Sequence, residues 1–145
     1  MTTLRRVPIA GWKRCVHEAA SFESPGEFKA ATLLDAAIQV EWWLRNDPPL
    51  LKIPTPIGYF EPDFVYRISR PTGAMMGLLE IKGESFWDGE GSVARIKADS
   101  ACAWVNAIQH SKATELWEFS VVLEQDVLEA ASLEAMLTNA QRRAP

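Results

Sequence analysis

The hydrophobic pattern of the chain predicts two neighbouring β-strands near its middle. Apolar residues dominate residues 64–68 and residues 77–81, and a turn containing Pro71 and Gly73 separates the two runs. Short apolar runs that contain β-branched or aromatic residues and are bounded by Pro or Gly are typical of strands. Because the connection between them is short, the two strands are expected to pair antiparallel.

Charged residues lie at one end of this predicted strand pair. Asp63 opens the first strand, and Glu80 and Lys82 lie near the end of the second. Side chains alternate across a strand, so Glu80 and Lys82 share one face while Leu79 and Ile81 share the other. An acid and a lysine together at the end of an apolar strand indicate a functional site.

A helix is predicted before these strands, from Ser24 to about Arg45. Ser24 is a suitable N-cap, Pro25 takes the first helical position, and Glu27 lies in the first turn at capping-box spacing. Apolar residues then recur at helical spacing in a broad stripe formed by Leu33, Leu34, Ala37, Ile38, Val40, Trp42 and Leu44. The Asn and Pro residues that follow Arg45 end this helix.

The remaining segments extend the alternation of strands and helices. Further strands are predicted at residues 12–17, 50–53 and 116–123, and further helices at residues 93–111 and, capped by Asp126, at residues 126–143. The order β-α-β-β-β-α-β-α predicts an α/β fold, a small mixed sheet flanked by helices.

Connection lengths set the expected directions of the strands. The strands between residues 50 and 82 are joined too closely for crossovers and should form an antiparallel meander. The long helix after residue 82 permits a parallel crossover to residues 116–123. Residues 1–11 have no periodic pattern and are expected to form a loose arm.

Composition indicates one globular domain spanning residues 1–145. The chain has 145 residues, 48% of them hydrophobic, and six tryptophans, which is enough to form a single core. No apolar run approaches the roughly 20 residues of a membrane span, and the N-terminus lacks the apolar core of a signal peptide. Cys15 and Cys102 stand apart from any metal-ligand spacing, so a reducing, cytoplasmic location is expected.

The charge balance argues against tight nucleic-acid binding by this chain alone. The net charge is −4, and the lysines and arginines are scattered rather than gathered on one stripe. A protein that binds nucleic acid by itself neutralises phosphates with a basic patch. A nuclease can tolerate this balance if metal ions join its acids to phosphate, or if a partner holds the nucleic acid.

The charged strand ends resemble a known nuclease motif. Pro62-Asp63 followed by Glu80-Ile81-Lys82 resembles the signature of the PD-(D/E)xK nuclease superfamily. From Trp12 to Leu123, the sequence is also similar to the C-terminal nuclease domain of type III restriction enzyme Res subunits. The segments that carry this similarity are Phe22-Glu23-Ser24 with Glu27, Leu33-Leu34-Asp35, Val40 to Asn46, Tyr59 to Val65, Leu79 to Gly83, and the helix from Lys97-Ala98 to Trp104.

This resemblance implies a restriction-endonuclease-like αβββαβ core and metal-dependent cleavage of DNA. It implies that Asp63 and Glu80 bind Mg²⁺, with Mn²⁺ as a substitute, because carboxylate oxygens are hard ligands. The backbone carbonyl of Ile81 would complete the coordination, and Lys82 would hold or deprotonate the attacking water. Judged without the resemblance, the same residues could be a surface Glu-Lys pair and an ordinary Asp beside a turn.

Three further residues are candidates with open alternatives. Glu27 is either an additional metal ligand or a helix cap. Lys97 lies on a predicted apolar stripe of its helix, where it would contact phosphate or Glu80, or else extend past the apolar edge. Trp87, in the polar loop after Lys82, is a candidate for contact with substrate bases.

The sequence therefore predicts a metal-dependent DNA endonuclease, the cutting module of a defence, transposition or repair assembly. Res subunits carry an ATP-driven helicase ahead of the nuclease, and no P-loop occurs here. We therefore expect a protein partner, either a motor or a DNA-recognition subunit, or else a homodimer. The alternative is a non-catalytic binding or assembly module that keeps the nuclease fold.

Overall fold

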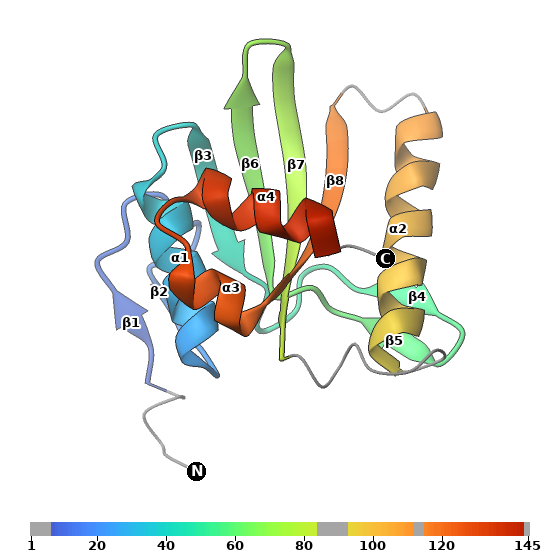
Figure 1. Cartoon of the computed structure of the whole chain (residues 1–145), viewed down its shortest axis with the longest axis horizontal. Coiled ribbons are helices and arrows are strands. Elements are labelled where there is room, and N and C mark those ends of the chain that lie inside the picture. The colour runs from blue at the N-terminus through green and yellow to red at the C-terminus, as the bar shows by residue number, and fades with distance from the viewer. Residues whose placement is uncertain (1–6, 84–92, 112–114, 144–145) are drawn as a thin grey trace.

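A four-stranded mixed sheet forms the centre of the molecule (Figure 1). The computed structural model describes residues 7–83, 93–111 and 115–143. The strands lie in the order β3 (Val40–Arg45), β6 (Phe64–Arg70), β7 (Gly73–Lys82) and β8 (Leu116–Leu123). β3, β6 and β7 pair antiparallel, and β8 pairs parallel with β7.

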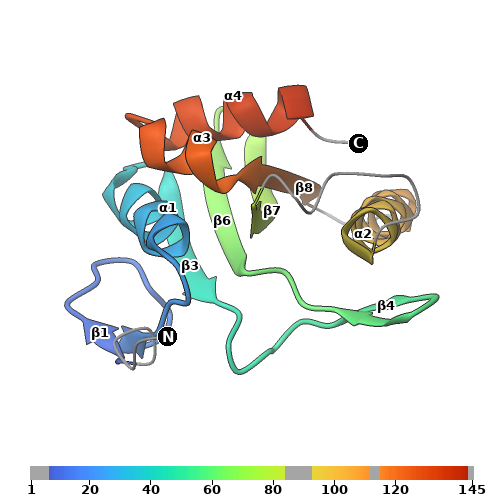
Figure 2. The same ribbon diagram turned by 60° about the horizontal axis from the view of Figure 1, so that its bottom comes forward.

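Three helices cover one face of this sheet. They are α1 (Pro25–Ala36), α3 (Glu124–Glu129) and α4 (Leu133–Arg143), which lie on the same side in Figure 2. A hydrophobic core between these helices and the sheet includes the fully buried Trp43 and Phe64. A small two-stranded sheet, β1 (Ile9–Ala10) and β2 (Ala19–Ala20), lies beside α1 (Figure 1).

The opposite face packs on a single long helix and a hairpin. α2 (Val93–His110) and the hairpin of β4 (Ile53–Thr55) and β5 (Gly58–Phe60) lie on this side (Figure 2). A second hydrophobic core between them and the sheet includes Leu78 and Val105. The sheet is thus covered on both faces, and the expected α/β class with a mixed sheet flanked by helices is confirmed.

The central hairpin agrees with the sequence pattern. Residues 64–68 and 77–81 lie within β6 and β7, and the turn between these strands contains Pro71 and Gly73. Tyr66 lies directly opposite Gly77, and a Cβ atom at Gly77 would overlap the buried Tyr66 ring. The glycine is therefore needed for packing at this position. The predicted helix at residues 93–111 and the parallel strand at residues 116–123 are also confirmed.

The first helix ends earlier than the sequence pattern predicts. Its N-terminus is confirmed, because Ser24 Oγ accepts a hydrogen bond from the Glu27 N–H at 3.1 Å. The predicted extension to Arg45 is wrong: α1 ends at Ala36, and residues 40–45 form β3. Ile38, assigned to the apolar stripe, is 88% exposed. The aromatic and β-branched residues of this segment gain more from pairing with β6 than from extending the helix.

The predicted meander of consecutive strands is wrong in its first strand, although β6 and β7 pair antiparallel as expected. Residues 50–53 were expected to pair with the central hairpin, yet only Ile53 belongs to a strand, and it pairs within the separate β4–β5 hairpin. β3 takes the place beside β6 instead. Residues 12–17 do not form the predicted strand either, apart from an isolated bridge between Cys15 and Trp43.

The two ends of the chain also differ in part from expectation. The single helix predicted at residues 126–143 is two helices, α3 and α4, and α3 begins before Asp126. Ser132 separates them and caps α4, since its hydroxyl accepts a hydrogen bond from the Ala135 N–H at 3.1 Å. Within the predicted arm at residues 1–11, Ile9 and Ala10 are paired in β1, while residues 1–6 lie outside the described residues.

Candidate active site at the ends of the central strands

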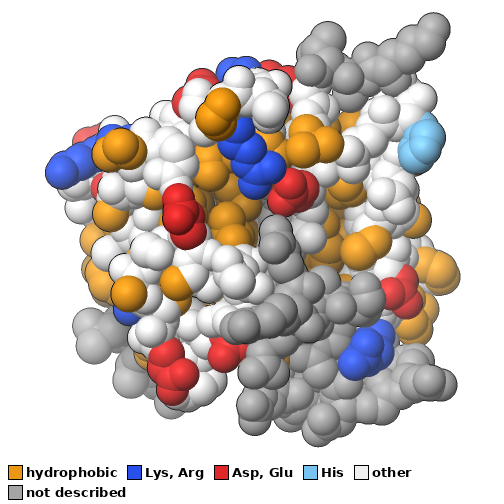
Figure 3. All heavy atoms as spheres, turned by 45° about the horizontal axis from the view of Figure 1, so that its top comes forward, with side chains coloured by type: hydrophobic (Ala, Val, Ile, Leu, Met, Phe, Trp, Pro, Cys, Tyr) orange, Lys and Arg blue, Asp and Glu red, His pale blue; other side chains and the backbone are white. Residues whose placement is uncertain are grey.

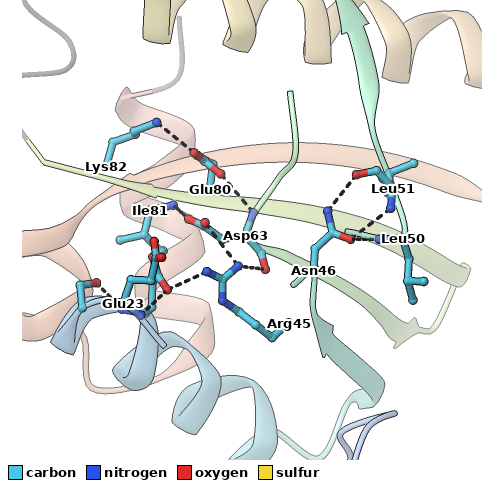
Figure 4. A network of polar contacts seen from close by, with 11 residues as sticks. Glu23, Arg45, Asn46, Leu50, Leu51, Asp63, Glu80, Ile81 and Lys82 are labelled. Atoms are coloured by element: carbon cyan, nitrogen blue, oxygen red, sulfur yellow. Dashed lines mark hydrogen bonds and ion pairs between the residues drawn. The ribbon is translucent and has the colours of Figure 1, made fainter. Parts of the chain in front are cut away.

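Asp63 and Glu80 meet where β6 begins and β7 ends. Antiparallel pairing sets Phe64 opposite Leu79, so the residues just beyond this pair, Asp63 and Glu80, are brought side by side. The Asp63 N–H donates to Glu80 Oε1 at 3.1 Å, and the Ile81 N–H donates to Asp63 Oδ2 at 2.8 Å (Figure 4). Main-chain groups thus fix both carboxylates, which gives the site a defined geometry before any ligand binds.

Lys82 lies next to Glu80 on the α2 face of the sheet. Its Nζ is 3.1 Å from Glu80 Oε2 (Figure 4). Together the two side chains line a narrow space with Phe60, Ala94, Ala98, Phe119 and Val121. Leu79 and Ile81 belong to the core on the other face, so the predicted alternation along β7 is confirmed. The acid and the lysine are consequently held in an apolar setting at the strand end.

Arg45 is a member of the site that the sequence analysis did not identify. It is the last residue of β3, only 6% exposed, and its guanidinium lies 5.7 Å from the centre of the Phe64 ring. Arg45 Nη1 donates to the Asp63 carbonyl oxygen at 2.9 Å and lies 3.6 Å from Asp63 Oδ1 (Figure 4). Arg45 Nη2 lies 3.0 Å from Glu27 Oε1. The guanidinium therefore joins two carboxylates.

Strand alternation, which the helix prediction for residues 40–45 did not consider, would have made Arg45 a candidate site residue. If residues 40–45 are a strand, Trp43 and Arg45 share a face by alternation. Trp43 indeed belongs to the core beneath α1, and Arg45 faces Glu27 of that helix. The assignment to a helix placed Arg45 at a helix end, far from the strand ends that carry Asp63 and Glu80.

Glu27 has partners that belong to both of its proposed roles. Its Oε1 accepts the Glu23 N–H at 3.0 Å, one residue before the Ser24 N–H that a capping box would use, and so still contacts the chain at the helix entrance. The same carboxylate pairs with Arg45, which places it next to Asp63. Glu27 therefore supports the helix entrance and belongs to the charged cluster, but Arg45 stands between it and the β6–β7 end.

Burial sets the protonation behaviour of the three acids. Burial and then the charge of Asp63 raise the pKa of Glu80 to about 8, although Lys82 opposes this. Burial also raises the pKa of Asp63 against the Ile81 N–H and the charge of Arg45. Burial and the Asp63 charge raise the pKa of Glu27, which Arg45 partly offsets. Each carboxylate thus lacks sufficient positive charge around it, and an additional cation would stabilise the ionised forms.

A polar cavity opens on the Arg45 side of Asp63. Its volume is about 230 Å³, and its lining consists of Glu23, Arg45, Asn46, Asp47, Glu61 and Asp63. Asn46 shapes one wall, because its Oδ1 accepts the Leu50 and Leu51 N–H groups at 2.8 Å and 3.1 Å (Figure 4). The cavity is rich in carboxylates, so it attracts cations rather than free anions.

The remaining predicted site residues differ in how the structure places them. Lys97 lies in α2 and is half-buried, and no hydrogen bond or ion pair among the described residues joins it to Glu80. The Ile81 N–H donates to the Asp63 side chain. In a β-strand the N–H and the carbonyl of one residue point to the same side of the strand, so the Ile81 carbonyl also points towards Asp63. Trp87 lies outside the described residues.

The donor set of the strand ends suits Mg²⁺ as a two-carboxylate site. Among the described residues, no group of three or more His, Cys, Asp and Glu side chains is arranged to hold a metal ion. Mg²⁺ commonly takes one or two protein carboxylates and completes its shell with waters and substrate phosphate oxygens. The neighbouring, largely buried carboxylates of Asp63 and Glu80 fit that pattern.

Comparison with protein-family models, with curated proteins and with solved structures finds no match for this chain. Within the part of the chain that the structure describes, no helix has the length and apolar character needed to cross a membrane. Function must accordingly be argued from the chemistry of the site itself.

Proposed function

We propose that this chain is a metal-dependent nuclease that hydrolyses phosphodiester bonds in DNA, with a restriction-endonuclease-like PD-(D/E)xK core. The observation that carries the proposal is the meeting of Asp63, Glu80 and Lys82 at one end of β6 and β7. The order of the main-sheet strands and their flanking helices, α1-β3-β6-β7-α2-β8 with the β4–β5 hairpin inserted after β3 and with β8 parallel to β7, supports it as well, because it follows the αβββαβ order of that core.

Each residue has a defined task in this proposal. Asp63 and Glu80, with the Ile81 carbonyl at the same strand edge, would hold Mg²⁺ or Mn²⁺. When bound, such a cation polarises a phosphate group and makes a neighbouring water more acidic. Lys82, fixed beside Glu80, would orient the water that adds to phosphorus while the P–O bond to the leaving nucleoside oxygen breaks. Lys97 and Trp87 remain candidates for substrate contact.

A cleavage assay tests this proposal directly. Supercoiled, linear and single-stranded DNA would each be incubated with the purified chain in Mg²⁺, Mn²⁺ or EDTA. Cleavage should require the metal and should vanish in Asp63→Ala and Glu80→Ala, while Glu118→Ala, a partly exposed acid on β8, serves as the matched control. Full activity in either site variant would remove that residue from the site. A well-folded wild type that never cuts would favour the non-catalytic module.

The distribution of charge supports delivery of DNA by a partner. The net charge is −4, and Arg45, Arg67 and Arg70 are each already paired with carboxylates. On the face shown in Figure 3, lysine and arginine side chains occur in small separate groups, next to acids and apolar surface. A surface of this kind neutralises few phosphates, so a motor subunit, a DNA-recognition subunit or a second copy would position the DNA.

An equilibrium binding measurement tests partner delivery separately from cleavage. Fluorescence anisotropy of labelled duplex DNA with the metal-loaded Lys82→Met variant, at about 150 mM salt to match physiological screening, gives the affinity without cutting. The dissociation constant should lie in the weak non-specific range of about 10⁻⁴–10⁻⁶ M. Nanomolar binding would instead describe a nuclease that needs no partner for DNA binding.

A further inference from the structure

Arg45 has no part in the hydrolysis proposed above, although it lies in the middle of the site. It reaches the carboxylates from β3, on the face of the sheet that packs against α1, whereas Lys82 and Glu80 point to the face that packs against α2. Asp63 lies between the two and contacts both groups, through its side chain to Arg45 and through its N–H to Glu80. The site is thus built from two halves that share Asp63.

We propose that Arg45 is a built-in second cation, so that the site binds a single divalent metal ion and Glu27 positions Arg45 instead of binding metal. This inference rests on the proposed metal-dependent function. Arg45 bridges Glu27 and Asp63 through Nη2 and Nη1, at 3.0 Å and 3.6 Å, and so occupies the place where a second ion would join the same two carboxylates.

The charge balance of the site favours one divalent ion over two. Glu27, Asp63 and Glu80 are opposed by Arg45 and Lys82, so three carboxylates and two cations leave one negative charge when all are ionised. One divalent ion together with one phosphodiester group brings this total to zero. A second divalent ion would add two positive charges that these five side chains and one phosphodiester do not offset, in a region where Arg45 and Glu80 are each only 6% exposed, and such burial is costly. The other acids of the cavity, Glu23, Asp47 and Glu61, line its wall outside this paired set.

The contacts of Arg45 also fix it in place against competition from a metal ion. Its Nη1 donates to the main-chain carbonyl of Asp63, and its guanidinium packs on the Phe64 ring. These contacts do not depend on the carboxylate charges, so they hold Arg45 in position when a cation approaches. Glu27 Oε1 already accepts the Glu23 N–H and pairs with Arg45 Nη2, so this oxygen is engaged by protein groups on the α1 side.

The first test counts Mn²⁺ ions and measures their affinity by calorimetry, with free Mn²⁺ followed by electron paramagnetic resonance. Wild type should bind one Mn²⁺ per chain. Glu80→Gln should weaken binding by more than about 100-fold, beyond the range seen when only an outer partner is lost, and Glu27→Gln by less than about tenfold. Two ions in wild type, or equal losses in the two variants, would overturn the inference.

The second test removes the built-in cation. Arg45→Met should open a second Mn²⁺ position between Glu27 and Asp63, and Mn²⁺ should then raise the melting temperature more than it does in wild type. The double variant Arg45→Met with Glu27→Gln removes both partners and should return to one ion. Arg45→Lys keeps the positive charge and should also bind one ion. A single unchanged site in a folded Arg45→Met variant would contradict the inference.

These measurements separate this inference from the function on which it rests. If wild type binds no Mn²⁺ and cuts no DNA, both the proposed nuclease function and the single-ion site are wrong. If wild type binds two ions and cuts DNA, the nuclease function stands and the role of Arg45 is wrong. If Arg45→Met does not fold, with or without Mn²⁺, the Mn²⁺ affinities of Glu27→Gln and Glu80→Gln are sufficient to test whether Glu27 binds the metal.

Discussion

Two sets of ion pairs in this protein have the same composition and very different surroundings. At the strand ends, Arg45 and Lys82 oppose Glu27, Asp63 and Glu80. Farther along the sheet, two arginines of β6 oppose three acids that lie on β3, just before β8 and on β8, in the pairs Arg67–Glu41, Arg67–Glu115 and Arg70–Glu118. Each set therefore contains two cations and three carboxylates.

Exposure to solvent separates the two sets. The side chains of Arg45 and Glu27 are 7% and 11% exposed, whereas those of Arg70 and Glu118 are 35% and 34% exposed. Water screens the second set, so its pairs contribute little to stability. In the first set, burial raises the pKa of all three acids despite the nearby cations. A cluster that is costly to maintain in the folded state is the better candidate for function.

Removal of one cation from each set should give the largest contrast. Arg45→Met leaves the buried Glu27 and Asp63 without their shared partner, and we expect a loss of about 3–5 kcal/mol in the free energy of unfolding in EDTA. Arg67→Met, the matched change in the exposed set, should cost less than about 1 kcal/mol. Urea denaturation followed by circular dichroism measures both. Equal losses would show that burial does not distinguish the two sets.

The two sets should also differ in their effect on catalysis. Lys82→Met keeps the bulk of the side chain but removes its charge, so turnover should fall by roughly 10²-fold or more, the scale of a water-activating group. Mn²⁺ binding should persist, because the carboxylates remain. Arg70→Met should leave both quantities unchanged. Loss of Mn²⁺ binding together with turnover would make Lys82 a structural support.

The pH dependence of stability should come from the buried set. The pKa of Glu80 rises from 4.5 to about 8 on folding, so the folded chain binds this proton more tightly than the unfolded chain. The contribution of this proton to the free energy of unfolding is fully present below about pH 4.5 and is lost as the pH rises through about 8.

Thermal melting of the metal-free protein across this pH range measures the effect. The free energy of unfolding should fall by up to about 5 kcal/mol between the two limits, since one unit of pKa shift corresponds to about 1.4 kcal/mol and the pKa of about 8 already includes the opposing charge of Lys82. Glu80→Gln should flatten the profile, and Glu118→Gln should leave it unchanged. A profile that Glu80→Gln does not alter would assign the titration to another group.

The smallest effect is expected within the exposed set. A double-mutant cycle with Arg70→Ala and Glu118→Ala should give a coupling of about 0.2–1 kcal/mol, because the pair is a partly exposed surface contact. Added salt should reduce this coupling further. A coupling as large as that of a buried pair would remove the distinction drawn between the two sets.

Much of the sheet could be predicted from local sequence, but one strand could not. The hairpin of β6 and β7 has apolar runs, a Pro-Gly turn and short connections, which together leave few alternatives. Residues 40–45 fit both periodicities, since the same apolar residues lie on a helical stripe and in a strand. Their assignment depends on β6, with which they pair along most of their length. The local pattern alone therefore favours a longer helix, and the pairing with β6 selects the strand.

The sequence by itself determined the half of the site that is close along the chain. Asp63 precedes one strand, Glu80 and Lys82 end the next, and the hairpin between them brings these ends together by strand geometry alone. Only the tertiary structure decided that Arg45 and Glu27 belong to the same site, because a helix and a strand from elsewhere must pack before they meet. It also decided which charges are buried, since burial depends on packing from distant segments and not on residue type.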